Sequence, residues 1–172
     1  MKFVVDQMYH RLARWLRMLG YDTVYNQDFV DQDFIQIAKK ENRIILTRDE
    51  DLKRRAEKLG LQAVTVDAPT IEERLIILHK ELGIELALPK KKLPRCTICN
   101  SEIRFIDTEE IIDQITEQTQ LYYKEFWMCK NAECSQIYWR GSHWEKMERT
   151  LKDCREIIAL EKANNKKQNK NV

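Results

Sequence analysis

Acidic residues follow four short apolar runs in the first half of the chain. Each run is too short for a helix and is typical of a buried strand. The runs and the acidic residues after them are Phe3-Val4-Val5 with Asp6, Thr23-Val24-Tyr25 with Asp28, Ile44-Ile45-Leu46 with Thr47-Arg48-Asp49-Glu50-Asp51, and Ala63-Val64-Thr65-Val66 with Asp67. In open parallel α/β sheets the ligand crevice lies beyond the carboxyl ends of the strands, so these carboxylates are expected to converge.

Converging carboxylates repel one another unless a cation lies among them. Hard oxygen ligands suit Mg²⁺ or Mn²⁺, which commonly bind one or two carboxylates together with substrate phosphates. The pattern therefore favours metal-dependent phosphodiester chemistry. Helix capping is the alternative for any single residue: Asp49 stands at an expected N-cap, and Glu50 and Asp51 stand in the first turn, where the helix dipole favours negative charge. Recurrence at four strand ends is the argument for a site.

Two cysteine pairs in the second half have the spacing of metal ligands. They are Cys96-Thr97-Ile98-Cys99 and Cys129-Lys130-Asn131-Ala132-Glu133-Cys134. Such pairs, separated by a segment that can form strands, are typical of a structural Cys₄ zinc ribbon. Four thiolates complete a tetrahedron, so His143 is not needed as a ligand and the zinc is expected to fold the module without doing chemistry. Cys154 remains, and we expect it to be buried as a small hydrophobe.

Helical patterns alternate with the four strands. The expected helices cover residues 7–19, 31–40, 49–59 and 70–82. Asp31 and Asp49 are expected N-caps, and Thr70 with Glu73 has the spacing of a capping box. This alternation predicts a parallel α/β layer. Because glycine occurs in residues 1–88 only at positions 20, 60 and 83, no glycine-rich loop supports a nucleotide-binding domain.

Basic residues are expected along the outer face of the first helix. His10, Arg14 and Arg17 project opposite its apolar side, and Arg11 lies at the margin. The fork of an arginine matches phosphate oxygens, although a solvated helix face is the simpler interpretation. The candidate nucleic-acid contacts are Arg11, Arg14, Arg17, Arg48 and Arg140.

A lysine-rich segment bounded by Pro89 and Pro94 marks a linker. We expect a nuclease-like domain over residues 1–88, the linker and zinc ribbon over 89–145, and a helix with a disordered tail from residue 164 over 146–172. A linker of about eight residues spans at most about 28 Å, so the ribbon must stay close. Lys90, Lys91 and Lys92 could therefore continue a basic strip that contacts phosphates across both modules.

Aromatic residues crowd the second cysteine pair, and two interpretations remain open. The residues are Tyr122, Tyr123, Phe126, Trp127, Tyr138, Trp139 and Trp144, with Arg140 and His143 among them. They could stack bases, but a module this small also needs aromatic side chains to form its core.

The composition is that of a globular protein, with 43% hydrophobic and 34% charged residues in 172 and a formal net charge of +2. No apolar run is long enough for a membrane span, and Asp6 interrupts the first one, which excludes a signal peptide there. Cysteines used as metal ligands indicate a reducing compartment, so we expect a cytoplasmic protein. The oligomeric state does not follow from the sequence.

With both halves considered together, the chain resembles the Mut-seven C-terminal RNase domain family, in which a PIN-like nuclease domain precedes a zinc ribbon. The resemblance runs to about Met147 and rests on the following segments. They are Phe3-Val4-Val5-Asp6, residues 11–22, Arg43-Ile44-Ile45-Leu46-Thr47-Arg48-Asp49, the cysteine pairs, and Ile137-Tyr138-Trp139-Arg140-Gly141-Ser142-His143. The second pair departs from the usual Cys-x-x-Cys, because four residues separate Cys129 from Cys134.

The resemblance implies an α/β fold with a PIN-like parallel sheet flanked by helices, a small C-terminal zinc ribbon and a terminal helix. It also implies a Mg²⁺- or Mn²⁺-dependent endoribonuclease site at Asp6, Asp31 and Asp49, with Asp51 and Asp67 as weaker matches. The expected partner is single-stranded RNA, which the basic strip would position across both modules. A different class of function remains open: a non-catalytic RNA-binding module, in which the aspartates are helix caps and the ribbon makes the contacts.

Overall fold

The computed structural model describes residues 1–89 and 94–168, with side chains described up to residue 165 after the gap. Lys90, Lys91 and Lys92, which were expected to extend a basic strip, lie outside the described residues. The same holds for the end of the expected tail, at residues 169–172.

A parallel sheet of four strands forms the centre of the first half. In sheet order the strands are β2 (Asp22–Val24), β1 (Lys2–Val5), β3 (Ile44–Thr47) and β4 (Ala63–Thr65). Neighbouring strands pair with Val4 opposite Val24 and Ile45, and with Leu46 opposite Val64. Every residue of β3 is buried, as expected for a central strand covered on both faces.

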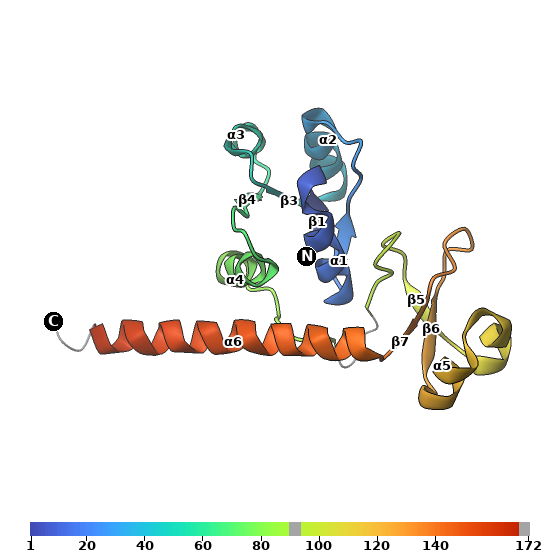
Figure 1. The fold of residues 1–172 in the computed structure, drawn as a ribbon. Helices are drawn as coiled ribbons and strands as arrows, with labels where there is room; N and C mark the ends of the chain where they lie inside the picture. Colours follow the sequence, from blue (N-terminus) through green and yellow to red (C-terminus); the bar gives the residue numbers. More distant parts are fainter. Residues whose placement is uncertain (90–93, 169–172) are drawn as a thin grey trace.

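Helices cover both faces of this sheet, which confirms the predicted α/β fold (Figure 1). On one face, α1 (His10–Met18) and α4 (Ile71–Leu82) pack against Phe3 and Val5 of β1. On the other face, α2 (Asp31–Glu41) and α3 (Glu50–Lys58) pack against Val4 of β1 and Ile45 of β3. The first predicted helix begins as a short 3₁₀ turn, η1 (Gln7–Tyr9), before α1. Period-two alternation along the strands thus divides the core into two layers.

Helix caps agree with the sequence at two of three positions. Asp49 caps α3, and Thr70 with Glu73 forms the predicted capping box of α4. The prediction for Asp31 was wrong, since Asp31 is the first helical residue and Val30 precedes it. The helix is capped instead by Asp33, whose carboxylate accepts a 2.9 Å hydrogen bond from the Val30 N–H.

A separate antiparallel sheet carries the cysteines. Its strands are β5 (Ile103–Ile106), β6 (Phe126–Cys129) and β7 (Ile137–Trp139), in that order. Between β5 and β6 the chain forms η2 (Thr108–Gln114) and α5 (Glu117–Tyr122). Phe126, Ile106 and Ile111 form a small buried cluster under these turns, so part of the aromatic content serves as core.

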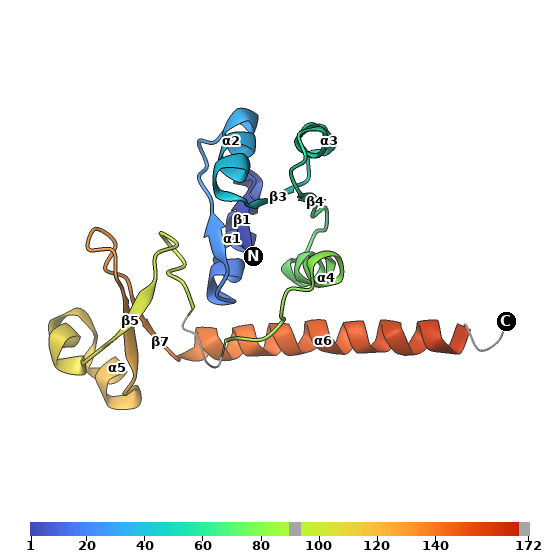
Figure 2. The ribbon, with the colours of Figure 1, turned by 180° about the vertical axis from the view of Figure 1, so that it is seen from behind.

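The last helix, α6 (Ser142–Gln168), runs from the ribbon back along α4 (Figure 2). Leu151, Cys154 and Ile158 on α6 belong to the same buried cluster as α1 and α4. Cys154 is fully buried, as predicted. The predicted disorder from residue 164 was wrong for residues 164–168, because the helix continues through them.

Candidate active site

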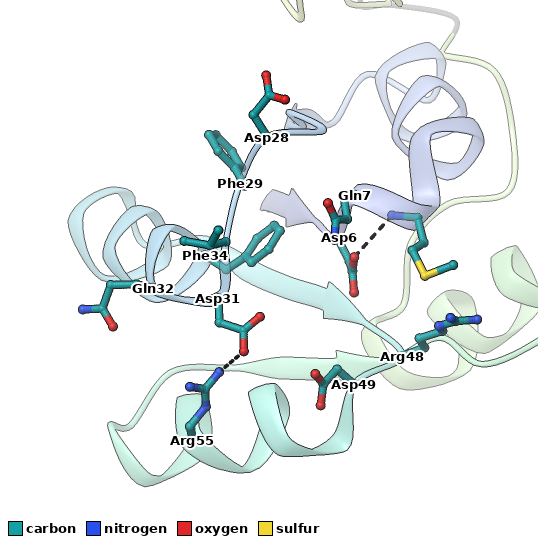
Figure 3. Close-up of a pocket in the computed structure, with 12 residues that line it drawn as sticks. Asp6, Gln7, Asp28, Phe29, Asp31, Gln32, Phe34, Arg48, Asp49 and Arg55 are labelled. Carbon is teal, nitrogen blue, oxygen red and sulfur yellow. Dashed lines mark hydrogen bonds and ion pairs between the residues drawn. The ribbon is translucent and has the colours of Figure 1, made fainter.

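A hollow of about 640 Å³ lies at the carboxyl ends of β1 and β3. Asp6, Asp28, Asp31 and Asp49 are among the residues that line it. They come from four places in the sequence: the ends of β1 and β3, the loop after β2, and the start of α2. Figure 3 shows Asp6, Asp31 and Asp49 around the same space. The fold therefore brings together the three aspartates that the sequence singled out.

Asp6 is held in place by neighbours on β3 and η1. Its side chain accepts 2.7 Å and 3.3 Å hydrogen bonds from the Thr47 hydroxyl and the Met8 N–H, and the residue is 9% exposed. The Thr47 oxygen also accepts a 3.0 Å hydrogen bond from the Asp49 N–H. Thr47 thus links two of the aspartates, a role that sequence reasoning missed although the Thr-Arg-Asp element pointed to this segment.

Asp49 is the N-cap of α3. Its Oδ1 accepts hydrogen bonds of 2.7 Å and 3.1 Å from the N–H groups of Asp51 and Leu52. Asp6 occupies the equivalent position before η1. The capping interpretation is therefore correct for both residues, and it is compatible with a second role because each carboxylate also lines the hollow.

Asp31 lies across the hollow from Asp6 and pairs with Arg55 of α3. Both side chains are about half exposed, at 51% for Asp31 and 49% for Arg55. Arg55 also lines the hollow. No sequence motif identified Arg55, since its relation to Asp31 arises only when α2 and α3 lie side by side on one face of the sheet.

Two further aspartates proposed from the sequence do not join this group. Asp51 was predicted as a catalytic residue, but it is exposed, forms an ion pair with Arg54 and is not among the residues that line the hollow. It lies in the first turn of α3, two residues after the N-cap Asp49. Asp67 is likewise not among the lining residues, whereas Asp28 is.

The donor set suits a hard cation, but the carboxylates do not enclose one by themselves. Within the described part of the chain, the four paired cysteines are the one group of three or more potential ligand residues close enough together to hold a metal ion. Mg²⁺ keeps several waters and takes the rest of its ligands from one or two carboxylates and substrate phosphates. Carboxylates spread around an open hollow suit this kind of partly hydrated Mg²⁺ site, in which the protein supplies only some of the ligands.

Arg17 does not lie on an exposed basic face, and the prediction that it contacts nucleic acid is corrected. The residue is 4% exposed. Its Nη1 donates 2.9 Å hydrogen bonds to the carbonyl oxygens of Thr97 and Ile98, and its Nε donates one of the same length to Thr23. Burial lowers the pKa of Arg17 from its ordinary value. Its position faces β2 rather than solvent.

The other basic candidates are accessible to different extents. Arg11 and Arg14 are exposed on α1, and Arg48 lines the hollow beside Asp49. Arg140 lies over the rings of Trp127 and Trp144, at 5.4 Å and 5.3 Å from their centroids. With Arg17 buried between Arg14 and the ribbon, the predicted basic strip is interrupted on α1.

The four paired cysteines converge on one point. All four sulfur atoms lie within 4.8 Å of one another, and the Cys99–Cys129 and Cys96–Cys134 sulfur separations are 3.4 Å and 3.6 Å. Four thiolates arranged tetrahedrally at about 2.3 Å from Zn²⁺ lie about 3.8 Å apart. The cluster is compatible with zinc binding, including the wider second pair.

The cysteine knuckle docks on the amino-terminal end of β2, opposite the carboxylates. Asn100 accepts a 2.9 Å hydrogen bond from the Thr23 N–H and donates one of 2.7 Å to Asp22. Asp22 also pairs with the buried Arg43 at 2.8 Å. Burial alone would raise the pKa of Asp22, but hydrogen bonds from Arg43 and Asn100 hold it below its ordinary value.

Aromatic side chains of the ribbon divide between core and surface. Phe126 and Trp127 are buried, whereas Trp139 is 39% exposed and Phe105 is 52% exposed. The core interpretation is therefore confirmed for Phe126 and Trp127, and base stacking stays a prediction for the exposed rings. Within the described residues, no helix is both long and apolar enough to cross a membrane.

Comparison with known proteins gave one result. A family model described as the Mut7-C RNAse domain matches residues 1–151, which include both sheets and the start of α6. Comparisons with curated proteins and with solved structures found no match.

Proposed function

We propose, because the chain belongs to the Mut7-C RNAse domain family, that it is a ribonuclease that hydrolyses phosphodiester bonds of single-stranded RNA at Asp6, Asp31 and Asp49. The observation that carries this proposal is the placement of three aspartates, from separate elements, around one hollow at the carboxyl edge of the sheet. That edge is where ligands bind in open parallel sheets. An RNA substrate follows from the family, and a divalent cation follows from the carboxylates.

In this proposal the three aspartates act as ligands for Mg²⁺ or Mn²⁺ and do not carry protons. The cation would activate a water molecule and neutralise charge on the departing oxygen. Thr47 keeps the Asp6 carboxylate turned into the hollow through its 2.7 Å hydrogen bond. Arg48, on the same wall, would contact a phosphate of the strand.

Substitution by asparagine separates chemistry from capping. Asparagine caps a helix about as well as aspartate does, so Asp49→Asn retains the α3 cap but loses the charge. We expect the double variant Asp6→Asn with Asp49→Asn to lower Mn²⁺-dependent cleavage of single-stranded RNA by more than about a hundredfold. Loss of a residue that only hydrogen-bonds to a metal ligand already costs about 10- to 100-fold, and loss of the ligands themselves should cost more. Unchanged cleavage would refute the assignment.

Asp51→Asn is the matched control for this test. Asp51 is exposed, lies two residues from Asp49 and is outside the hollow. We expect this variant to cleave RNA within about threefold of the wild type, since its ion pair with Arg54 is on the surface. Equal losses in Asp49→Asn and Asp51→Asn would point to a general effect of charge on α3.

The second candidate function is a non-catalytic RNA-binding module, favoured by the capping roles of Asp6 and Asp49. In that case Phe105, Trp139 and Arg140 on the ribbon would contact the bases and phosphates. RNA binding by EDTA-treated, zinc-retaining protein, together with no cleavage of any RNA tested, would favour this function.

For either function the cysteine cluster is proposed to hold a structural Zn²⁺ that folds the ribbon. We assign the division into a nuclease domain, a ribbon that adds RNA affinity and a terminal helix as part of this proposal. Because reducing compartments keep such thiol ligands free of disulfides, we propose that the protein acts in the cytoplasm.

A further inference from the structure

Arg55 is the feature of the hollow that neither the sequence motifs nor the family match assigns. Its guanidinium crosses from α3 to the Asp31 carboxylate at the start of α2. We propose that Arg55 binds a phosphate of the RNA strand, and that it is freed for this contact when a divalent cation takes the Asp31 carboxylate. This inference rests on the proposed function and names a further substrate-binding residue at the same site.

The net negative charge around the hollow would repel an RNA phosphate unless cationic groups contact it. Four aspartates and two arginines line it, namely Asp6, Asp28, Asp31, Asp49, Arg48 and Arg55, which gives a net charge of −2. A phosphodiester is an anion and is repelled by that balance. Among the described residues on the walls, Arg48 and Arg55 are the two cationic side chains that can attract it. One divalent cation brings the net charge of the lining residues to zero, so that both arginines can contact the RNA strand.

The pair between Arg55 and Asp31 is weak enough to exchange. Both side chains are about half exposed, and pairs of this kind change an equilibrium constant by less than about tenfold. A divalent cation carries twice the charge of a guanidinium and binds carboxylates strongly. Once Asp31 is coordinated, the fork of Arg55 has free N–H donors that match two phosphate oxygens.

Arg54 provides a matched control on the same helix. It has the same charge and pairs with Asp51, but it does not line the hollow. Arg55→Gln and Arg54→Gln therefore remove one positive charge each from neighbouring residues of α3. A difference between these variants reports the position of Arg55 and not the total charge of the protein.

Binding of Mn²⁺ alone, measured by electron paramagnetic resonance on the zinc-loaded protein without RNA, is the first readout. We expect Arg55→Gln to bind Mn²⁺ about two- to fivefold more tightly than the wild type, because the competing partner of Asp31 is gone. Arg54→Gln is expected to match the wild type. If the wild type binds no Mn²⁺, both the proposed function and this inference fail.

Binding of a labelled single-stranded RNA across a salt series is the second readout, with Ca²⁺ present and strand integrity checked on a gel. We expect Arg55→Gln to lower the log–log salt slope by about 0.7, the value for one lost phosphate contact. Arg54→Gln should keep the wild-type slope. Tighter Mn²⁺ binding combined with weaker RNA binding cannot result from misfolding, which would weaken both.

The inference alone is overturned if the wild type binds Mn²⁺ but Arg55→Gln behaves as Arg54→Gln does in both measurements. Arg55 would then form an ordinary surface ion pair, and the proposed function would stand without it. Arg55→Lys refines the result: we expect it to keep the salt slope but to lose part of the RNA affinity, because a lysine has charge without the fork.

Discussion

The guanidinium of Arg17 lies 2.9 Å from the carbonyl oxygen of Thr97, and this contact joins α1 to the cysteine knuckle. Arg17 is 4% exposed and also donates to Ile98 and Thr23. Each carbonyl in this group would lose its partner if the guanidinium were removed. The ribbon is therefore held against the α/β layer by a buried polar contact and not only by the linker.

Arg17→Met should destabilise the protein by about 1–3 kcal/mol, because buried acceptors are left without a hydrogen bond. Arg14→Met, on the exposed face of the same helix, is the control and should change stability by less than about 0.5 kcal/mol. Urea unfolding followed by circular dichroism measures both. Equal midpoints for the two variants would show that Arg17 contributes nothing to the docking.

Removal of zinc with a strong chelator should loosen β2 although no ligand comes from that strand. The Thr23 N–H donates to Asn100, which directly follows Cys99 in the knuckle. Without the metal the knuckle should lose its fold, as in other small zinc modules, and the Thr23 amide should exchange faster with deuterium. Peptides from β3 provide the internal control, and unchanged exchange in β2 would argue that the knuckle keeps its fold without metal.

Asp22 should contribute to the pH dependence of stability. Although burial opposes it, hydrogen bonds from Arg43 and Asn100 lower its pKa in the folded protein. The stabilisation is therefore present above the unfolded pKa of about 3.9 and is lost as pH falls through the lower folded value. Asp22→Asn should be less stable than the wild type by about 1–3 kcal/mol at pH 7.

Acid titration checks the sign of this effect. The difference between wild type and Asp22→Asn should shrink as the pH is lowered below about 4, since the unfolded chain then binds a proton at Asp22 while the folded protein still holds the carboxylate ionised. Unfolding by urea at pH 7, 5 and 3 measures it. A difference that stays constant over this range would mean that ionisation of Asp22 does not stabilise the fold.

Leu151→Ala should destabilise the α/β domain although Leu151 belongs to the terminal helix α6. Leu151 lies on α6, is 1% exposed and belongs to the cluster that includes Leu75 and Leu78 of α4. Truncation of a buried leucine costs about 2–5 kcal/mol. Leu160→Ala on the same helix is the control, because Leu160 is 65% exposed; thermal unfolding that shifts equally in both would contradict the packing of α6 on this core.

Local signals predicted most of the fold. The Thr70–Glu73 capping box and the cysteine spacing each depend on a few neighbouring residues, and each is found as expected. Of the strand-end aspartates, Asp6, Asp28 and Asp49 line one hollow, whereas Asp67 does not. The start of α2 was predicted correctly, but its N-cap was assigned to Asp31 because of the residue type. Only the backbone shows that Val30 occupies the cap position and that Asp33 bonds back to it.

Contacts between distant elements could not be predicted in the same way. Helical periodicity placed Arg17 on the polar face of α1, which is correct, but it could not show that the ribbon covers this end of that face. Residues 164–168 have a polar composition typical of disorder, yet they continue a helix that is anchored by Leu151 and Ile158. Arg55 meets Asp31 only through the packing of α2 beside α3.

The return of α6 onto α4 affects the order in which the chain can fold during synthesis. Strands β1 to β4 and their helices leave the ribosome first, and domains generally fold as they emerge. Here the apolar surface formed by Leu75 and Leu78 stays open until Leu151 and Ile158 have been made. The nascent α/β layer must therefore remain partly exposed through the synthesis of the whole ribbon, which makes this interval the stage at which a chaperone would be needed.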